Sequence, residues 1–274
     1  MNICKNCQHE FEGSFCNACG EKVIHEKDFR INNIISQAFG TLTNFDSKIF
    51  QTLKLLFFFP GKLTIKFVEG IRVPYMKPFQ LFVISNIVFF IFLSELDLFR
   101  NPSQWYFSEY FDGVRVMDKV RSISEKKGLE ISEIAVAYDK RSSSLAKGLI
   151  IVYIPFIALI GYLFNIKMGI AFGKHIIFAT HFFSFFLFYL VIISGVNYLI
   201  DDKFNKWFFV IPTILIIPVY YAIGFKTFYR SSWLAALWKG ILAVFLILIL
   251  TQFYRIGINF LSLYTLLIPM CLTP

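Results

Sequence analysis

The chain has 274 residues, of which 57% are hydrophobic and only 16% are charged. Soluble domains carry about 25% charged residues, so this composition excludes a soluble globular domain of this size. The net charge of +9 is compatible with nucleic-acid binding, but in a membrane protein basic residues in cytoplasmic loops are the usual orientation signal, and we favour that interpretation.

The N-terminal segment carries the strongest motif. Two C-x-x-C pairs are separated by eight residues: Cys4, Cys7, Cys16 and Cys19. Two such pairs complete the tetrahedral thiolate site that is typical of structural Zn²⁺, and Gly20 follows the second pair, where a tight turn needs positive φ. We therefore predict a zinc-ribbon knuckle over residues 1–24 with Zn²⁺ as a structural cofactor. A four-thiolate site leaves no open position for a catalytic water.

Two other uses of these cysteines are weaker predictions. Disulfide bonds need an oxidising compartment. A thioredoxin-like redox motif needs a surrounding βαβ unit, which the sequence lacks. Thiolates that hold zinc indicate a reducing compartment, so we expect the N-terminus to be cytoplasmic.

Residues 25–78 link the knuckle to the membrane. Three short helices are predicted there: one beginning near Phe29, one over Ile49–Phe57 and one over Leu63–Glu69. The second is too short to span, ends at the turn signal Pro60-Gly61 and carries Lys54 among its apolar residues. It either lies in the headgroup region as an interfacial amphipathic helix or packs on the bundle.

The rest of the chain, residues 79–274, is predicted to be a transmembrane domain. Apolar blocks long enough to cross a bilayer lie at about 79–98, 149–164, 175–199, 207–225 and 234–250. Pro155 predicts a kink in the second span, which neighbouring helices can accommodate. The apolar tail at 256–272 either extends the fifth span or forms a sixth; we favour five. The fold class is thus an all-α membrane protein, a bundle of about five transmembrane helices with an N-terminal knuckle.

The loop at 99–147 is the only long polar stretch after the knuckle. We predict a small extracytoplasmic helical lid there, with a solvated spacer as the alternative. Basic residues favour a cytoplasmic N-terminus, since they gather beside the first span and in the turns at 167–174 and 226–239, whereas the 201–206 turn has no net charge. Those beside the first span are Lys62, Lys66, Arg72 and Lys77.

Polar residues inside apolar spans are functional candidates by default. Here they are Asn86, His175, His181 and Asn197. The two histidines are six residues apart, so on a helix they point about 120° away from each other and are poorly placed to share a metal. No catalytic motif such as H-E-x-x-H or G-x-S-x-G is present, so we do not expect an enzyme.

Three segments carry a resemblance to a known family. They are the C-x-x-C…C-x-x-C-G knuckle, the string from Phe57-Phe58-Phe59-Pro60-Gly61 to Tyr75-Met76-Lys77-Pro78-Phe79, and the span His175–Phe185. Together they resemble an uncharacterised bacterial family of polytopic membrane proteins with an N-terminal zinc ribbon, the domain of unknown function DUF3667. The resemblance implies a multi-pass protein of the bacterial cytoplasmic (inner) membrane and transfers no activity. Family members often carry a histidine where this chain has Phe183, which argues against a three-histidine metal site.

Two functions follow as hypotheses. The first is a membrane-anchored interaction, assembly or sensory protein, whose knuckle and basic linker bind a cytoplasmic protein partner or anionic lipid. The second is a transporter or channel component that uses Asn86, His181 and Asn197. Nucleic acid is not an expected partner, because residues 1–28 carry three lysines and no arginine against five acids. The sequence leaves the ligand and the oligomeric state undetermined.

Overall fold

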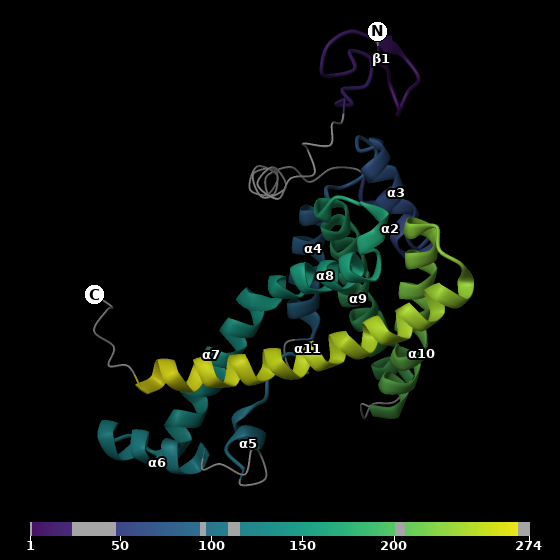
Figure 1. The fold of residues 1–274 in the computed structure, drawn as a ribbon. Coiled ribbons are helices and arrows are strands. Elements are labelled where there is room, and N and C mark those ends of the chain that lie inside the picture. Colours follow the sequence, from purple (N-terminus) through teal and green to yellow (C-terminus); the bar gives the residue numbers. More distant parts are fainter. Residues whose placement is uncertain (1, 24–47, 94–96, 109–115, 201–205, 268–274) are drawn as a thin grey trace. The chain divides into compact units, whose positions relative to one another are not determined.

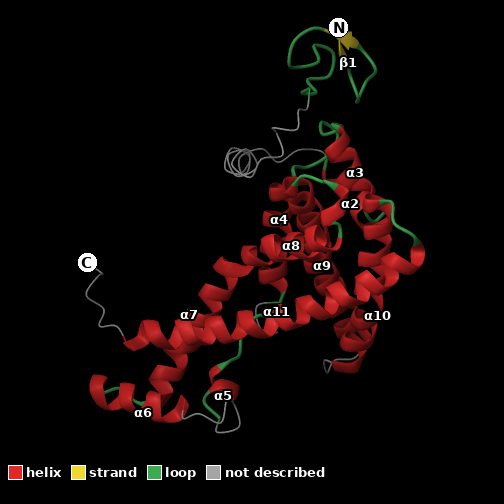
Figure 2. Cartoon of the chain, viewed as in Figure 1, coloured by secondary structure: helices red, strands yellow, loops and turns green. Residues whose placement is uncertain are grey.

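The computed structural model describes residues 2–23, 48–93, 97–108, 116–200 and 206–267. Most of these residues are helical, and strands occur only near the N-terminus (Figure 1, Figure 2). The chain divides into two compact units. The first comprises Met1–Phe92 and Tyr153–Phe245, and the second comprises Leu93–Val152 and Leu246–Pro274.

The knuckle begins with two short strands. Strand β1 (Asn2–Ile3) pairs antiparallel with β2 (Glu10–Phe11). The buried hydrophobic side chains of this segment are only Cys4, Phe11 and Cys16. So small a core supplies little folding free energy, so the segment needs a further source of stability.

Two of the three predicted linker helices fall within the described residues. Helix α2 (Ile49–Phe58) and helix α3 (Lys62–Glu69) are joined by the turn at Pro60 and Gly61. Pro60 cannot continue a helix, and Gly61 adopts φ 82°, which favours glycine. The predicted helix near Phe29 lies outside the described residues.

Helix α4 (Pro78–Phe92) occupies the place of the predicted first span, 79–98, and is shorter than that prediction. Proline at its first position suits a helix start, since the missing N–H would have no partner there. Helices α4 and α8 (Tyr153–Phe164) both pack against α9 (Phe172–Ile200). The ring of Phe183 on α9 stacks on rings from both neighbours.

The helix that contains the predicted second span, 149–164, begins well before that span. Helix α7 (Ile131–Leu149), a 3₁₀ turn (Ile150–Val152) and α8 form one helical stretch, Ile131–Phe164. Charged residues in α7 interrupt the apolar pattern and hid this continuity. The 3₁₀ turn lies just before Pro155, which lacks an N–H and crowds the preceding turn of an α-helix.

Four described helical stretches are long and apolar enough to cross a membrane: Ile131–Phe164, Phe172–Ile200, Trp207–Tyr229 and Trp233–Leu266. The third lies in α10 (Lys206–Tyr229), which includes two prolines, and the fourth lies in α11 (Trp233–Leu267). Helix α11 runs without a break through the region predicted as 234–250, so the described part of the apolar tail extends it. With the shorter apolar helices, these elements make a multi-pass, all-α membrane protein.

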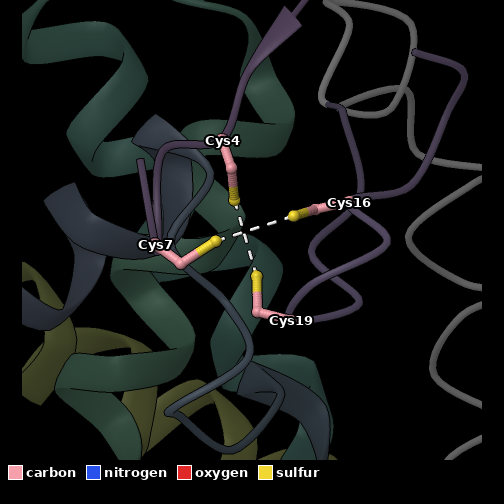
Figure 3. A group of neighbouring side chains, drawn as sticks. All are labelled: Cys4, Cys7, Cys16 and Cys19. Atoms are coloured by element: carbon pink, nitrogen blue, oxygen red, sulfur yellow. Dashed lines mark hydrogen bonds between the residues drawn. The ribbon is translucent and has the colours of Figure 1, made fainter. Parts of the chain in front are cut away.

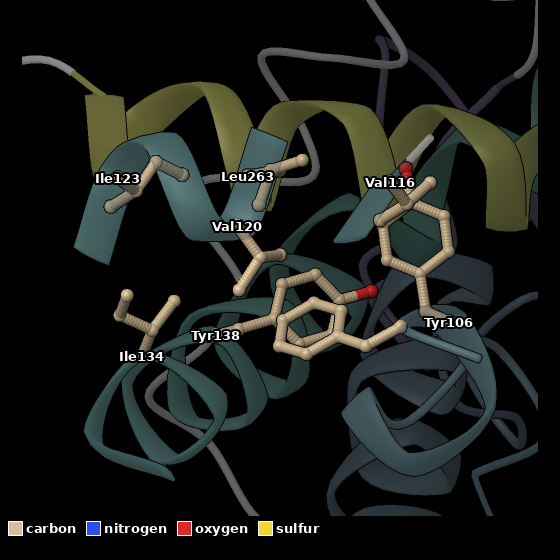
Figure 4. Packing of buried hydrophobic residues seen from close by; sticks show 8 residues of the cluster. Tyr106, Val116, Val120, Ile123, Ile134, Tyr138 and Leu263 are labelled. Atoms are coloured by element: carbon tan, nitrogen blue, oxygen red, sulfur yellow. The ribbon is translucent and has the colours of Figure 1, made fainter. Parts of the chain in front are cut away.

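The predicted polar lid at 99–147 is helical in its described parts and belongs to the second unit. It contains α5 (Ser103–Tyr106), α6 (Val116–Lys127) and most of α7. Their apolar side chains form a small core in which Tyr106 stacks on Tyr138, with ring centroids 5.5 Å apart (Figure 4).

A charged network that the sequence did not predict joins the start of this unit to α7. The Asp139 carboxylate accepts hydrogen bonds from Arg100 Nη1 at 2.7 Å and from the Ser103 hydroxyl at 2.6 Å. The Ser103 backbone N–H also donates to Asp139, at 3.0 Å. Arg100 in addition pairs with Asp97 at 2.5 Å. The carboxylate of Asp139 therefore holds α5 on α7.

We expect Asp139→Asn to loosen α5 from α7. The neutral amide loses charge-assisted hydrogen bonds to Arg100 and Ser103, at a cost of about 1–3 kcal/mol. Limited proteolysis of the reconstituted chain should cleave faster around residues 97–108. The exposed Lys140→Gln on the same helix is the control and should cleave like the wild type. Equal cleavage of all three proteins would contradict this role of Asp139.

Candidate metal centre and buried polar residues

The four predicted ligands converge. The sulfur atoms of Cys4, Cys7, Cys16 and Cys19 all lie within 4.8 Å of one another, and all four cysteines are free (Figure 3). The Cys4 and Cys19 sulfurs are 3.5 Å apart, and those of Cys7 and Cys16 are 3.6 Å apart. Zn–S bonds of about 2.3 Å in a tetrahedron place sulfurs about 3.8 Å apart, so the cluster fits one ion.

Each C-x-x-C pair sits in the same kind of turn, which explains the convergence. The Gln8 N–H donates to the Cys4 carbonyl at 2.9 Å, and the Gly20 N–H donates to the Cys16 carbonyl at 2.8 Å. Gln8 and Gly20 hold the same position in their turns, and both have positive φ, at 61° and 74°. The predicted need for positive φ at Gly20 is confirmed.

The thiols differ in acidity because their surroundings differ. The backbone N–H of Glu21 lowers the pKa of the Cys19 thiol to about 7. Although the backbone N–H of His9 lowers the pKa of Cys7, desolvation and the other three sulfurs raise it to about 12. Four adjacent thiolates repel one another, so a bound cation is needed to hold all of them deprotonated.

The four cysteine ligands determine which chemistry this centre can support. Four thiolates can hold a soft or borderline metal ion and leave no position for substrate or water. The chemistry is therefore structural: a metal would link the two turns and supply the folding free energy that the small core lacks.

Glu21 connects the knuckle to the linker, a contact that was not predicted from the sequence. The residue is only 4% exposed, and one carboxylate oxygen accepts hydrogen bonds from the backbone N–H groups of Arg72 and Val73, both at 2.9 Å. Successive N–H groups of this kind form an anion-binding nest. Arg72 is itself held by Phe67, whose carbonyl accepts from Nε at 3.1 Å. An acid directly after C-x-x-C-G is the only sequence signal for this contact.

We expect Glu21→Ala to release the loop at Arg72 and Val73 without loss of metal. Both amides lose a charged acceptor, so their hydrogen exchange should accelerate by about tenfold. Hydrogen–deuterium exchange with fragmentation to single residues measures this in the reconstituted chain. Glu12→Ala changes an exposed acid of the same knuckle and should leave the exchange unchanged. Unchanged exchange in Glu21→Ala would refute the contact.

The two intramembrane histidines have different partners. His175 Nδ1 lies 2.7 Å from the Tyr229 hydroxyl, and His181 Nδ1 lies 2.9 Å from the Thr64 hydroxyl. Both rings are buried, and neither Nε2 has a hydrogen-bond partner among the described residues. Each histidine thus joins α9 to another helix: His175 to α10 and His181 to α3.

Asn86 lies on a different helix from these histidines, and Asn197 lies far from His181 along α9. Asn86 lies on α4, and its Oδ1 has no hydrogen-bond partner in the described part of the chain. Asn197 is buried on α9, sixteen residues beyond His181, which corresponds to about 24 Å along the helix. The sequence missed the two hydroxyl partners, Thr64 and Tyr229, because nothing local marks them.

The fold and this centre together define a class: a multi-pass helical membrane protein with an N-terminal four-cysteine cluster that can bind a metal ion. Residues 46–90 match the family model described as "Protein of unknown function (DUF3667)". The matched segment includes α2, α3 and nearly all of α4, and it confirms the resemblance seen in the sequence. No curated protein and no solved structure matches the chain.

Proposed function

We propose that the chain is a membrane-anchored interaction protein whose knuckle, folded around one Zn²⁺, binds a cytoplasmic protein partner. The observation that carries the proposal is the closed cluster of four sulfurs, all within 4.8 Å of one another. Such a centre stabilises a surface and performs no chemistry of its own. Zinc is the proposed metal because it favours four-thiolate tetrahedral sites, and a reducing cytoplasm keeps the thiolates available.

The surface of the knuckle supports a binding role. Ile3 is 59% exposed and Phe15 is 60% exposed, although the segment buries very few hydrophobic side chains. Large apolar side chains left outside so small a core are suited to a protein interface, and aromatic residues are enriched at such interfaces. We therefore assign the partner contact to Ile3 and Phe15.

A photo-crosslinking amino acid in place of Phe15, in the full chain in its native membrane, tests this proposal. We expect a discrete adduct that disappears when Cys7→Ser is added, because loss of a ligand unfolds the binding surface. The same crosslinker at Lys167, an exposed position in the turn predicted to be cytoplasmic, is the control for random encounters. An adduct that survives Cys7→Ser, or none above the Lys167 level, would contradict the proposal.

A transporter or channel component is the second candidate, and one observation favours it. His181 is buried in a membrane-spanning helix with Nε2 unpartnered among the described residues. Intramembrane groups of this kind often mark a pathway. If the candidate is correct, His181→Ala should abolish flux of the transported solute in proteoliposomes, and Thr64→Val, which removes its hydrogen-bond partner, should reduce it. Unchanged flux in both variants would remove this candidate.

A further inference from the structure

Within the first unit, helices α2 and α3 both contact α9, and all three lie in the same part of Figure 1. The Phe57 ring, near the end of α2, lies 5.6 Å from Phe185 and 6.2 Å from Phe188, measured between centroids. Phe185 and Phe188 lie close to the midpoint of α9, a helix long and apolar enough to span the bilayer. The end of α2 is therefore near the middle of a span.

Helix α3 then runs back along α9 toward its start. Thr64 bonds to His181, and further along α3 Phe67 packs against Ile177. The contacts on α9 thus move from 188 and 185 to 181 and then to 177 as the chain advances from 57 to 67. A helix lying flat in the headgroup region would not produce this order, whereas a hairpin that enters and leaves on one side does.

One side of the turn between the helices is packed tightly against α10. A Cβ atom on Gly61 would lie 2.6 Å from the Gly224 carbonyl oxygen and 3.2 Å from Gly224 Cα. Gly224 belongs to α10, so the two backbones are in direct contact. Small residues permit such close approach between membrane helices.

Several polar backbone groups at this turn have protein partners. The Phe59 N–H donates to Leu55, the Lys62 N–H donates to the Phe59 carbonyl, and Pro60 has no N–H to satisfy. The Leu56 carbonyl, one of the last four of α2, accepts a hydrogen bond from the Tyr220 hydroxyl of α10 at 2.6 Å. Bonds of this kind from neighbouring helices are what non-helical backbone needs at membrane depth.

The outer face of α2 has a composition suited to lipid. Phe50 is 83% exposed and Phe58 is 76% exposed, and Lys54 is exposed midway between them at the same four-residue spacing. These three residues therefore share one face. Two bare aromatic rings fit acyl chains, and the lysine stem can extend along the helix so that its ammonium reaches the phosphate groups.

The charge around the hairpin also indicates that lipid lies beside it. Between residues 48 and 77 only one acid, Glu69, accompanies a larger set of basic residues: Lys48, Lys54, Lys62, Lys66, Arg72 and Lys77. Basic residues beside a membrane segment attract the negative surface of the lipid leaflet. At the end of α3 the exposed position Glu69 is charged, as expected where the chain returns toward the headgroups, whereas the Lys62 ammonium at the turn lies 4.6 Å from the centroid of the Phe59 ring.

We infer that Ile49–Glu69 is a re-entrant helical hairpin that enters the bilayer from the side of the N-terminal segment and turns at Pro60 and Gly61 within the bundle. The face formed by Phe50, Lys54 and Phe58 binds the lipids of that leaflet. The inference goes beyond the proposed function and does not depend on the metal.

Depth-dependent quenching tests it with the full chain in nanodiscs of phosphatidylethanolamine and phosphatidylglycerol. A bimane fluorophore is placed at Phe58→Cys, Phe50→Cys or Glu69→Cys, and identically treated unsubstituted chain sets the background from native cysteines. We expect a nitroxide near the end of the acyl chain to quench position 58 more than a headgroup nitroxide does. At position 50 the order should reverse, and at position 69 aqueous iodide should be the strongest quencher.

Three results would overturn the inference. Stronger headgroup quenching at both 50 and 58 would place α2 flat in the interface. Iodide quenching at position 58 would place that face in water. Protection of position 58 from both nitroxides and from iodide would mean that protein, not lipid, covers the face. All three substitutions are at exposed positions, so misfolding is not expected to confound the comparison.

Discussion

Cys16→Ser is expected to unfold the knuckle and leave the membrane-spanning helices intact. The variant removes one of four thiolates and most of the metal's contribution to folding, which for structural zinc sites is on the order of 10 kcal/mol. Because the remaining core is essentially Cys4 and Phe11, the short strand pair and the contact of Glu21 with the linker are too little to keep the segment folded. Limited proteolysis should remove the N-terminal segment from the variant many times faster than from the wild type, while circular dichroism keeps its helical signal.

Cys271→Ser provides the matched control, since it removes a cysteine that lies outside the two C-x-x-C pairs of the sequence. It should be cleaved at the wild-type rate. A metal chelator should raise the cleavage rate of the wild type and of Cys271→Ser to that of Cys16→Ser. Equal protease resistance of the Cys16→Ser and Cys271→Ser chains would show that the knuckle folds without its metal and would refute the structural role of the site.

Gly61→Ala is expected to be the most destabilising single change in the hairpin. Its φ of 82° is costly for alanine, about 1–2 kcal/mol. The new methyl group would also meet the Gly224 carbonyl oxygen at 2.6 Å, and overpacking of this kind adds about 1–3 kcal/mol. Thermal unfolding of the purified protein in detergent should show a clearly lowered midpoint, with the loss concentrated in the first unit.

Alanine substitutions at two other glycines distinguish the two causes of the lost stability, which are the positive φ of Gly61 and its close contact with Gly224. Gly169 also has positive φ, at 65°, but a Cβ there meets nothing within 4 Å, so Gly169→Ala should cost only about 1–2 kcal/mol. At Gly224 an added Cβ stays at 3.4 Å or more from its neighbours, so Gly224→Ala should cost little. A midpoint for Gly61→Ala equal to that of Gly169→Ala would mean that Gly61 is not packed against α10.

The features that follow from local chemistry were predictable. The spacing of the cysteines predicted a cluster because each C-x-x-C pair closes its own turn. The apolar blocks at 175–199 and 207–225 predicted α9 (Phe172–Ile200) and α10 (Lys206–Tyr229) to within a few residues. In both cases residues close together in the sequence are sufficient for the prediction.

The features that depend on distant partners were not predictable. The second span was predicted to start at 149 because Asp139, Lys140 and Arg141 interrupt the apolar run, yet Asp139 is paired with Arg100, 39 residues away. The position of α2 was left open between the interface and the bundle, since its partners Tyr220 and Gly224 follow more than 160 residues later. Glu21 was missed for the same reason.

Metal analysis of the purified chain shows directly whether the four cysteines of the knuckle hold zinc. Protein prepared in detergent under reducing conditions, without added metal and without a metal-affinity step, should contain about one zinc ion per chain. The Cys16→Ser variant prepared in parallel should contain none. Wild-type protein free of zinc, or zinc retained in the variant at the wild-type level, would contradict the account.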